Sequence, residues 1–220
     1  MRTILVLVAP VVLGMLTTGC AVTHETTTAQ VELDESVARS QASALSAAQG
    51  AAAAGDGVSI ADAITKIGDT AAALVPQGKS GAGRSRPGAA ATTCTCDAAA
   101  KRCAFDGCTI AGATVSGTLT WGGGKIVCDA ITVDAGTAHA SLECALTYSA
   151  TTLAGTVHTT GSAAVSGTTY AWDATLTASS VTVTSGKVTG GSLDVSASVD
   201  VTTSSSGTKA YAASAVVALE

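Results

Sequence analysis

The sequence predicts a mainly β protein with an N-terminal α segment: an antiparallel β-meander, a curved sheet or barrel-like, with one or two amphipathic helices packed on it. Apolar residues between residues 29 and 76 recur at every third or fourth position, which is the period of an amphipathic helix. From residue 110 onward they recur at every second position between short Gly-, Ser- and Asp-containing turns. That second pattern is typical of consecutive strands joined by hairpins.

Residues 29–76 are predicted to hold the helices. The run Gly55-Asp56-Gly57 interrupts the helical pattern, so we expect a break there. Ser59 and Asp62 resemble a capping box at the start of a second helix. The apolar side of this helix consists of Ile60, Ile64, Ile67, Ala71 and Leu74. So narrow a stripe needs a partner, either the first helix or the sheet. The alternative is a membrane-surface helix, and against it the polar side lacks the Lys and Arg enrichment that such helices show.

Residues 77–93 are predicted to be a linker, since Gly, Ser and Pro recur there and resist regular structure. Lys79, Arg84 and Arg86 make this stretch locally basic. It is either a solvated linker or a contact for anionic envelope polymers or lipid headgroups.

Residues 94–220 are predicted to form one cysteine-containing β-meander domain of seven or eight strands. Apolar positions alternate there with Ser, Thr and Asp, as in a sheet with one dry side. Closure into a barrel, folding into a sandwich, or packing of the helices would each cover that side. We favour a curled sheet with the helix of residues 60–74 against it, because both amphipathic elements then have a partner.

The first twenty residues have the layout of a secretory signal. Met1-Arg2 supplies a positive start, and residues 4–16 are almost wholly apolar. Small residues follow, ending in Gly19-Cys20. With a cysteine at that point the segment resembles the lipobox-type signal peptide of bacterial lipoproteins. The alternatives are an ordinary secretory signal that contains a cysteine, and a membrane-spanning helix, for which the apolar run is shorter than the usual span of about 20 residues.

The resemblance implies that residues 1–19 are a signal peptide removed on export and that Cys20 is lipidated. Residues 20–28 would then tether the chain to a membrane. In such lipoproteins an aspartate directly after the lipidated cysteine favours retention in the inner membrane. Ala21 stands at this position instead, so the resemblance favours the outer membrane. The resemblance therefore implies a lipoprotein of the cell envelope, facing the periplasm or the surface. It ends at Cys20 and does not extend to the mature body.

The number of cysteines agrees with an anchor at Cys20. The chain has seven cysteines, and lipidation of one leaves an even set, which consists of Cys94, Cys96, Cys103, Cys108, Cys128 and Cys144. In an oxidising compartment these six predict three disulfides, although their pairing stays open. Zinc is the weaker alternative, because the spacing lacks paired C-x-x-C arms.

Composition and motifs assign no catalytic residue and no cofactor. The net charge of −5 argues against nucleic-acid binding, which needs a basic face. No G-x-S-x-G nucleophile motif is present in the sequence. The run Gly122-Gly123-Gly124-Lys125 lacks the full spacing of a phosphate-binding loop and is predicted to be a turn.

One polar set is a weak candidate for a metal site. If residues 149–152 close a tight hairpin, Glu143 faces His158, and His139 lies on the same face of the strand. Two histidines and a carboxylate are a common metal-ligand set. The alternative is a solvent-exposed cross-strand pair.

The sequence thus favours a lipid-anchored envelope protein that acts as a non-enzymatic structural or interaction module. Its expected partners are the membrane, through the anchor, and an envelope polymer or protein. The runner-up is a carrier for an apolar or glycan ligand on the sheet face. Four aromatic residues predicted on the apolar side would serve such a ligand: Trp121, Tyr148, Tyr170 and Trp172. A metal-dependent enzyme is the third hypothesis.

Overall fold

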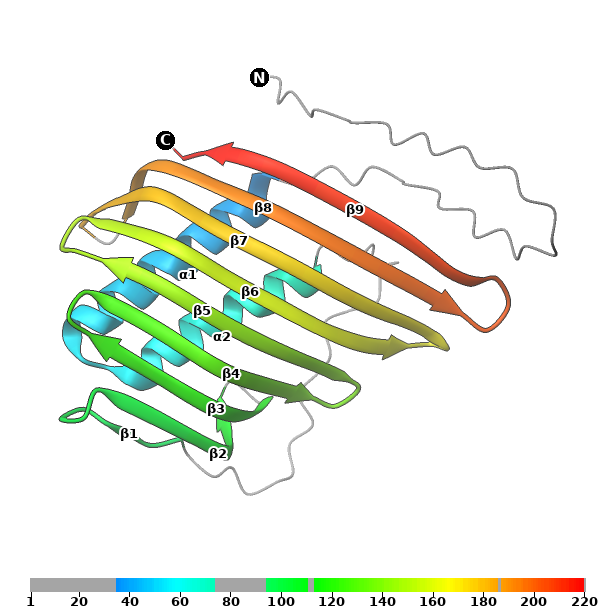
Figure 1. The fold of residues 1–220 in the computed structure, drawn as a ribbon, viewed down its shortest axis with the longest axis horizontal. Helices are drawn as coiled ribbons and strands as arrows, with labels where there is room; N and C mark the ends of the chain where they lie inside the picture. Colours follow the sequence, from blue (N-terminus) through cyan, green and yellow to red (C-terminus); the bar gives the residue numbers. More distant parts are fainter. Residues whose placement is uncertain (1–34, 74–93, 111–112, 186, 220) are drawn as a thin grey trace, which may run out of the picture.

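A computed structural model describes residues 35–73, 94–110, 113–185 and 187–219. The predicted signal peptide, the anchor Cys20, the tether and the linker 77–93 lie outside these residues. Two layers make up the described chain, a helix pair and a sheet (Figure 1). The helices are α1 (Glu35–Ala54) and α2 (Gly57–Ala73). The strands are β1 (Cys96–Asp97), β2 (Arg102–Ile110), β3 (Ala113–Gly122), β4 (Lys125–Ala135), β5 (Ala138–Tyr148), β6 (Thr152–Val165), β7 (Thr168–Thr184), β8 (Lys187–Thr203) and β9 (Gly207–Ala218).

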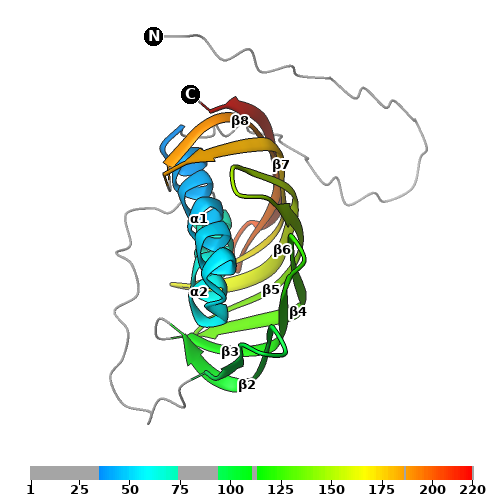
Figure 2. The same ribbon diagram turned by 90° about the vertical axis from the view of Figure 1, so that its left-hand side faces the viewer.

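The sheet is an antiparallel meander, as the alternating sequence predicts. Its nine strands lie in the order β1 to β9, and each pairs with the next strand along the chain. Among the described strands the first and the last do not meet, so the sheet is open, with β1 and β9 at its edges. Figure 2 shows that the sheet curls around the two helices, which lie on its concave side.

The helix pair covers the dry side of the sheet. Helix α1 lies along β6 and β8, whereas α2 lies across β1 to β3 and β5 to β7. Leu45 of α1 and Ile60, Ile64 and Ile67 of α2 are almost wholly buried. They share one core with inward-facing residues of the sheet such as Leu142. The helices therefore supply the cover that the alternation of apolar and polar residues requires.

Helix α2 begins at Gly57, two residues before the predicted cap at Ser59. Asp56 precedes the helix, and its carboxylate accepts a hydrogen bond from the backbone N–H of Ser59 at 3.1 Å and another from the Ser59 hydroxyl. These two bonds lower the pKa of Asp56 below its ordinary value. Ser59 and Asp62 do not form the predicted capping box: Asp62 instead pairs with Lys66 at 2.7 Å along the exposed side of the helix.

Bulges interrupt the two-residue period of the strands. In β4 the pairing with β5 shifts between Cys128 and Ile131, and Ala130 has a positive φ of 47°. Cys128 and Ile131 are consequently both buried although they stand three residues apart. A bulge of this kind adds a residue to one strand, bends it and increases its twist, so such shifts help the sheet curl around the helices.

Candidate functional site

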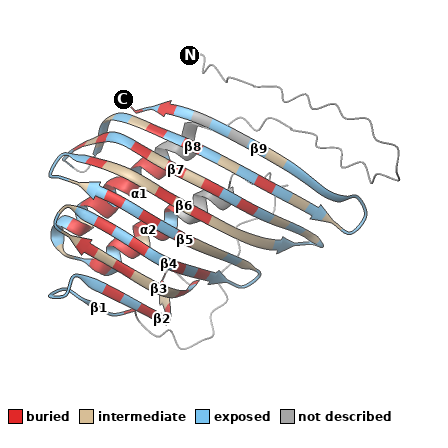
Figure 3. Ribbon diagram, in the orientation of Figure 1, coloured by how far each residue is buried: buried red, intermediate tan, exposed pale blue. Residues whose placement is uncertain are grey.

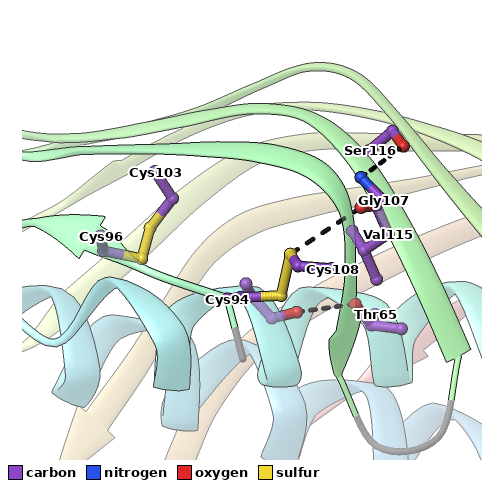
Figure 4. The surroundings of a disulfide bond; sticks show 9 residues. Thr65, Cys94, Cys96, Cys103, Gly107, Cys108, Val115 and Ser116 are labelled. Atoms are coloured by element: carbon purple, nitrogen blue, oxygen red, sulfur yellow. Dashed lines mark hydrogen bonds between the residues drawn. A yellow bond between two sulfur atoms is a disulfide. The ribbon is translucent and has the colours of Figure 1, made fainter. Parts of the chain in front are cut away.

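All six cysteines of the β domain are paired. The disulfides join Cys94 to Cys108, Cys96 to Cys103, and Cys128 to Cys144. The second fastens β1 to β2, and the first joins β2 to Cys94, which stands two residues before β1 (Figure 4). The third crosslinks β4 to β5, where its two residues face each other in register. The prediction of three disulfides is confirmed.

The face on which Cys128 lies is set by the bulge in β4. On the N-terminal side of that bulge, Ile126 and Cys128 point into the core. Cys144 on β5 points into the core as well. The sulfurs of Cys128 and Cys144 can therefore form a disulfide. Strict alternation through residues 126–133 does not predict this pairing, because the buried positions change from even to odd numbers at the bulge.

The weak metal candidates lie on the outer, convex face of the sheet. Glu143 stands opposite His158, which is the register that a tight hairpin at residues 149–152 predicts. His139 lies on the same strand as Glu143 but stands opposite Ser162. Among the described residues, no group of three or more His, Cys, Asp or Glu side chains is placed to hold a metal ion.

Each histidine instead pairs with an aspartate that the sequence reasoning had not included. His139 Nδ1 contacts Asp134 Oδ1 across the β4–β5 turn, and His158 Nε2 lies 2.9 Å from Asp173 Oδ1 on β7. The Asp134 partner follows from the tight turn at residues 135–138, which brings residues 134 and 139 into register. All four side chains are well exposed. Exposed pairs of this kind contribute little to stability and form no pocket.

The four aromatic candidates do not converge on one site. Trp121 is buried in the main core, and Tyr148 is half-buried against that core. Trp172 belongs to a second apolar cluster, whose other members are Val199, Ala140, Ala163, Tyr170 and Val201. This second cluster lies on the inner face of β5 to β8, because its residues alternate with the exposed convex ones.

A cavity lined by described residues lies between the helices and the sheet. Its lining consists of Gln41, Ile67, Val157, Thr159, Ala174, Thr175, Leu176 and Val195, and its volume is about 10 Å³. That is about the space of one water molecule, far below the roughly 300 Å³ of a small-molecule site. Two buried oxygens of its lining residues, Gln41 Oε1 and Thr159 Oγ1, have no hydrogen-bond partner within the protein.

The convex face of the sheet is polar. Buried and exposed residues alternate along the strands (Figure 3). On the outer side the central strands present mostly Thr and Ser with single charged residues, for example Thr132 on β4, Asp173 on β7 and Ser196 on β8. Thr, Ser and Asp side chains on this face are short, and the longer side chains of His139, Glu143 and His158 stand among them.

In the described residues, neither helix is long and apolar enough to cross a membrane. No protein-family model, curated protein or solved structure matches the chain.

Proposed function

We propose that this chain is a lipid-anchored cell-envelope protein that acts as a non-enzymatic structural or interaction module. The observation that carries the non-enzymatic part is the filled concave side of the sheet. Leu45, Ile60, Ile64 and Ile67 occupy it and are buried there almost completely. The broad convex face of Thr and Ser suits an envelope polymer or a protein better than a small substrate, because enzymes bind small substrates in clefts.

The cysteines support a lipid anchor at Cys20 and a location in an oxidising compartment. Disulfides persist in oxidising environments outside the cytoplasm, and the three bonds account for all cysteines of the chain but Cys20. The remaining one stands where the lipobox-like signal places the acylated residue. Ala21 favours the outer membrane, with the β domain facing the periplasm or the surface.

Intact mass of the membrane-extracted protein tests the anchor. We expect a chain that begins at Cys20 and carries acyl mass, and that gains six hydrogens on reduction, two for each disulfide. A chain that retains Met1, or one cut elsewhere, overturns the anchor. Replacement of Cys20 by Ser is the matched variant, and it should release the protein from the membrane fraction without changing the gain in mass on reduction.

Site-specific photocrosslinking in intact cells tests the interaction module. One crosslinker replaces exposed Ser198 on the convex face of β8, and the control crosslinker replaces Val201 near the concave cluster. We expect a discrete protein or polymer adduct from position 198. Adducts from position 201 alone, carrying a small apolar mass, would contradict the proposal.

A carrier is the second candidate function. The second apolar cluster favours it, because Trp172 and Tyr170 lie beside Val199 and Val201 on the inner face, separate from the main core. Aromatic side chains offer flat apolar area to a lipid or a sugar ring. The photocrosslinking experiment above distinguishes the two functions directly.

A further inference from the structure

The two edges of the sheet differ in how far they are protected. The first edge strand, β1, has two residues and is held to β2 by the Cys96–Cys103 disulfide. Strand β2 behind it is interrupted by a bulge between Phe105 and Cys108. Short strands and bulges are the devices by which natural proteins prevent edge-to-edge pairing.

Strand β9 carries none of these devices. It has twelve residues and pairs with β8 in an unbroken register from Gly207 to Ala218. It contains no proline, and Lys209 is its one charged residue. Among the described strands, β8 is its sole neighbour in the sheet. A long, regular and nearly uncharged edge is a template for another strand.

The backbone groups that β9 presents outward follow from its hydrogen bonds to β8. The N–H of Leu219 donates to the carbonyl of Gly191. In an antiparallel ladder these groups point alternately toward the partner and away from it, so the odd-numbered residues face β8. The residues whose N–H and C=O face outward are Thr208, Ala210, Ala212, Ser214, Val216 and Ala218.

The side chains of these six residues lie on the convex face and are small and uncharged, apart from the larger Val216. Val216 is 64% exposed. A strand laid beside β9 would cover part of that apolar side chain. None of the six side chains is long or charged, so none of them would keep a second strand away from the backbone of β9.

We propose that β9 pairs with β9 of a second copy of this chain, antiparallel, about a two-fold axis through Ala213. This inference does not depend on the lipid anchor or on the proposed partner. In this register every outward-facing residue opposes an outward-facing one: Thr208 opposes Ala218, Ala210 opposes Val216, and Ala212 opposes Ser214. The ladder between the copies then uses all of the outward N–H and C=O groups of both strands.

Charge and the blocked first edge both favour a second copy as the occupant. Lys209 of one copy opposes Val217 of the other, so the pairing brings no two like charges together, and like charges in direct opposition are unfavourable. A symmetric contact of β9 with itself also closes at two copies. Growth beyond two would need the other edge, which β1 and its disulfides occupy.

The sedimenting mass of the full chain, purified with its disulfides intact, tests the pairing. We expect twice the mass of the single purified chain, which is 21.2 kDa for all 220 residues, at high concentration and dissociation on dilution. Ala212→Lys with Ser214→Lys places lysine opposite lysine twice, and should raise the dissociation constant about tenfold. Ala212→Lys with Ser214→Glu places opposite charges together, and should pair at least as well as the unmodified chain.

The control is Ser196→Lys with Ser198→Lys on the convex face of β8, which adds the same charge one strand back from the edge, opposite Ser214 and Ala212, and should leave the mass unchanged. Equal dissociation constants for the Lys/Lys and Lys/Glu variants would overturn the register. A monomeric unmodified chain would overturn the pairing itself.

Hydrogen exchange identifies what covers the edge. In the dimer the amides of Ala210, Ala212, Ser214 and Val216 should exchange slowly, and the Lys/Lys variant should expose those of Ala210 and Val216 within the same fold. A monomer whose outward amides are already protected would show that another segment of the chain occupies the edge, and would refute the dimer.

Discussion

Gly155 offers the sharpest test of the packing between β5 and β6. Its φ is +128°, and a Cβ built on it would lie 2.1 Å from the carbonyl oxygen of Ala145 and 2.8 Å from the Cα of Leu146. Both contacts are with backbone of the neighbouring strand, which cannot rotate away as a side chain can. We therefore expect Gly155→Ala to force the two strands apart.

The control for this substitution is Gly167→Ala, in the turn that follows β6. Gly167 also has a positive φ, +80°, but no heavy atom lies within 4 Å of its built Cβ. Both substitutions incur backbone strain, which amounts to about 1–2 kcal/mol for a left-handed residue. Gly155→Ala adds an overpacking cost of about 1–3 kcal/mol, so its expected loss in the free energy of unfolding is roughly 2–5 kcal/mol.

Urea unfolding of the oxidised protein measures both losses on one scale, because the slope with denaturant reports whether the exposed surface has changed. The expected result is a loss for Gly155→Ala that exceeds that for Gly167→Ala by about 2 kcal/mol. Losses that agree within about 0.5 kcal/mol, the range of ordinary surface substitutions, would refute the steric argument.

Three further outcomes follow from other described residues. Thr159→Val should raise the free energy of unfolding by about 1 kcal/mol, because it removes a buried hydroxyl without a protein partner; a fall measured by urea unfolding would contradict this. Replacing Cys128 and Cys144 together by Ala should cost about 3 kcal/mol through loss of a loop closed over 16 residues, and an unchanged thermal midpoint would count against it. The lowered pKa of Asp56 contributes stability that is complete above the ordinary value of 3.8 and is lost as the pH falls through the lower folded value. Asp56→Asn should flatten this acid limb of the pH–stability profile, and an identical limb in the variant would exclude Asp56 as its source.

The fold was predictable because its local patterns are strong and agree with one another. Alternation along strands such as Leu193 to Val201 specifies which face is dry, and the helical stripe around Ile60 and Ile64 specifies a partner for it. The sequence predicts the cap of α2 at Ser59, which is too far along the chain, because Ser59 and Asp62 have the residue types of a capping box. The side chain of Asp56, next to Gly57, accepts the hydrogen bonds instead.

The disulfide pairing was not predictable because it depends on a bulge. Strict alternation cannot place Cys128 and Ile131 on one face, whereas the positive φ of Ala130 does so. Gly117 stands beside that bulge, and a Cβ there would lie 2.5 Å from the Ala130 carbonyl oxygen. The sequence shows the glycine but not the strand against which it packs.

The candidate polar site illustrates the same limit. The hairpin at residues 149–152 is local, so the pairing of Glu143 with His158 followed from the sequence. The contact of His158 with Asp173 joins β6 to the next strand, and it is diagonal, since His158 stands opposite Thr175 and Asp173 stands opposite Thr160.

The sequence by itself determined the meander, the helix pair and the even set of six cysteines, because each depends on residue types at short, regular spacings; the anchor at Cys20 stays a prediction of the lipobox-like segment. Tertiary structure decided the curl of the sheet, the cysteine partners and the two unlike edges. The curl and the Cys128–Cys144 pairing depend on bulges, and the edges depend on the order of the strands. Both are set by contacts between strands, which no single stretch of sequence shows. The open edge at β9 and the closed edge at β1 became visible for that reason only in the assembled sheet.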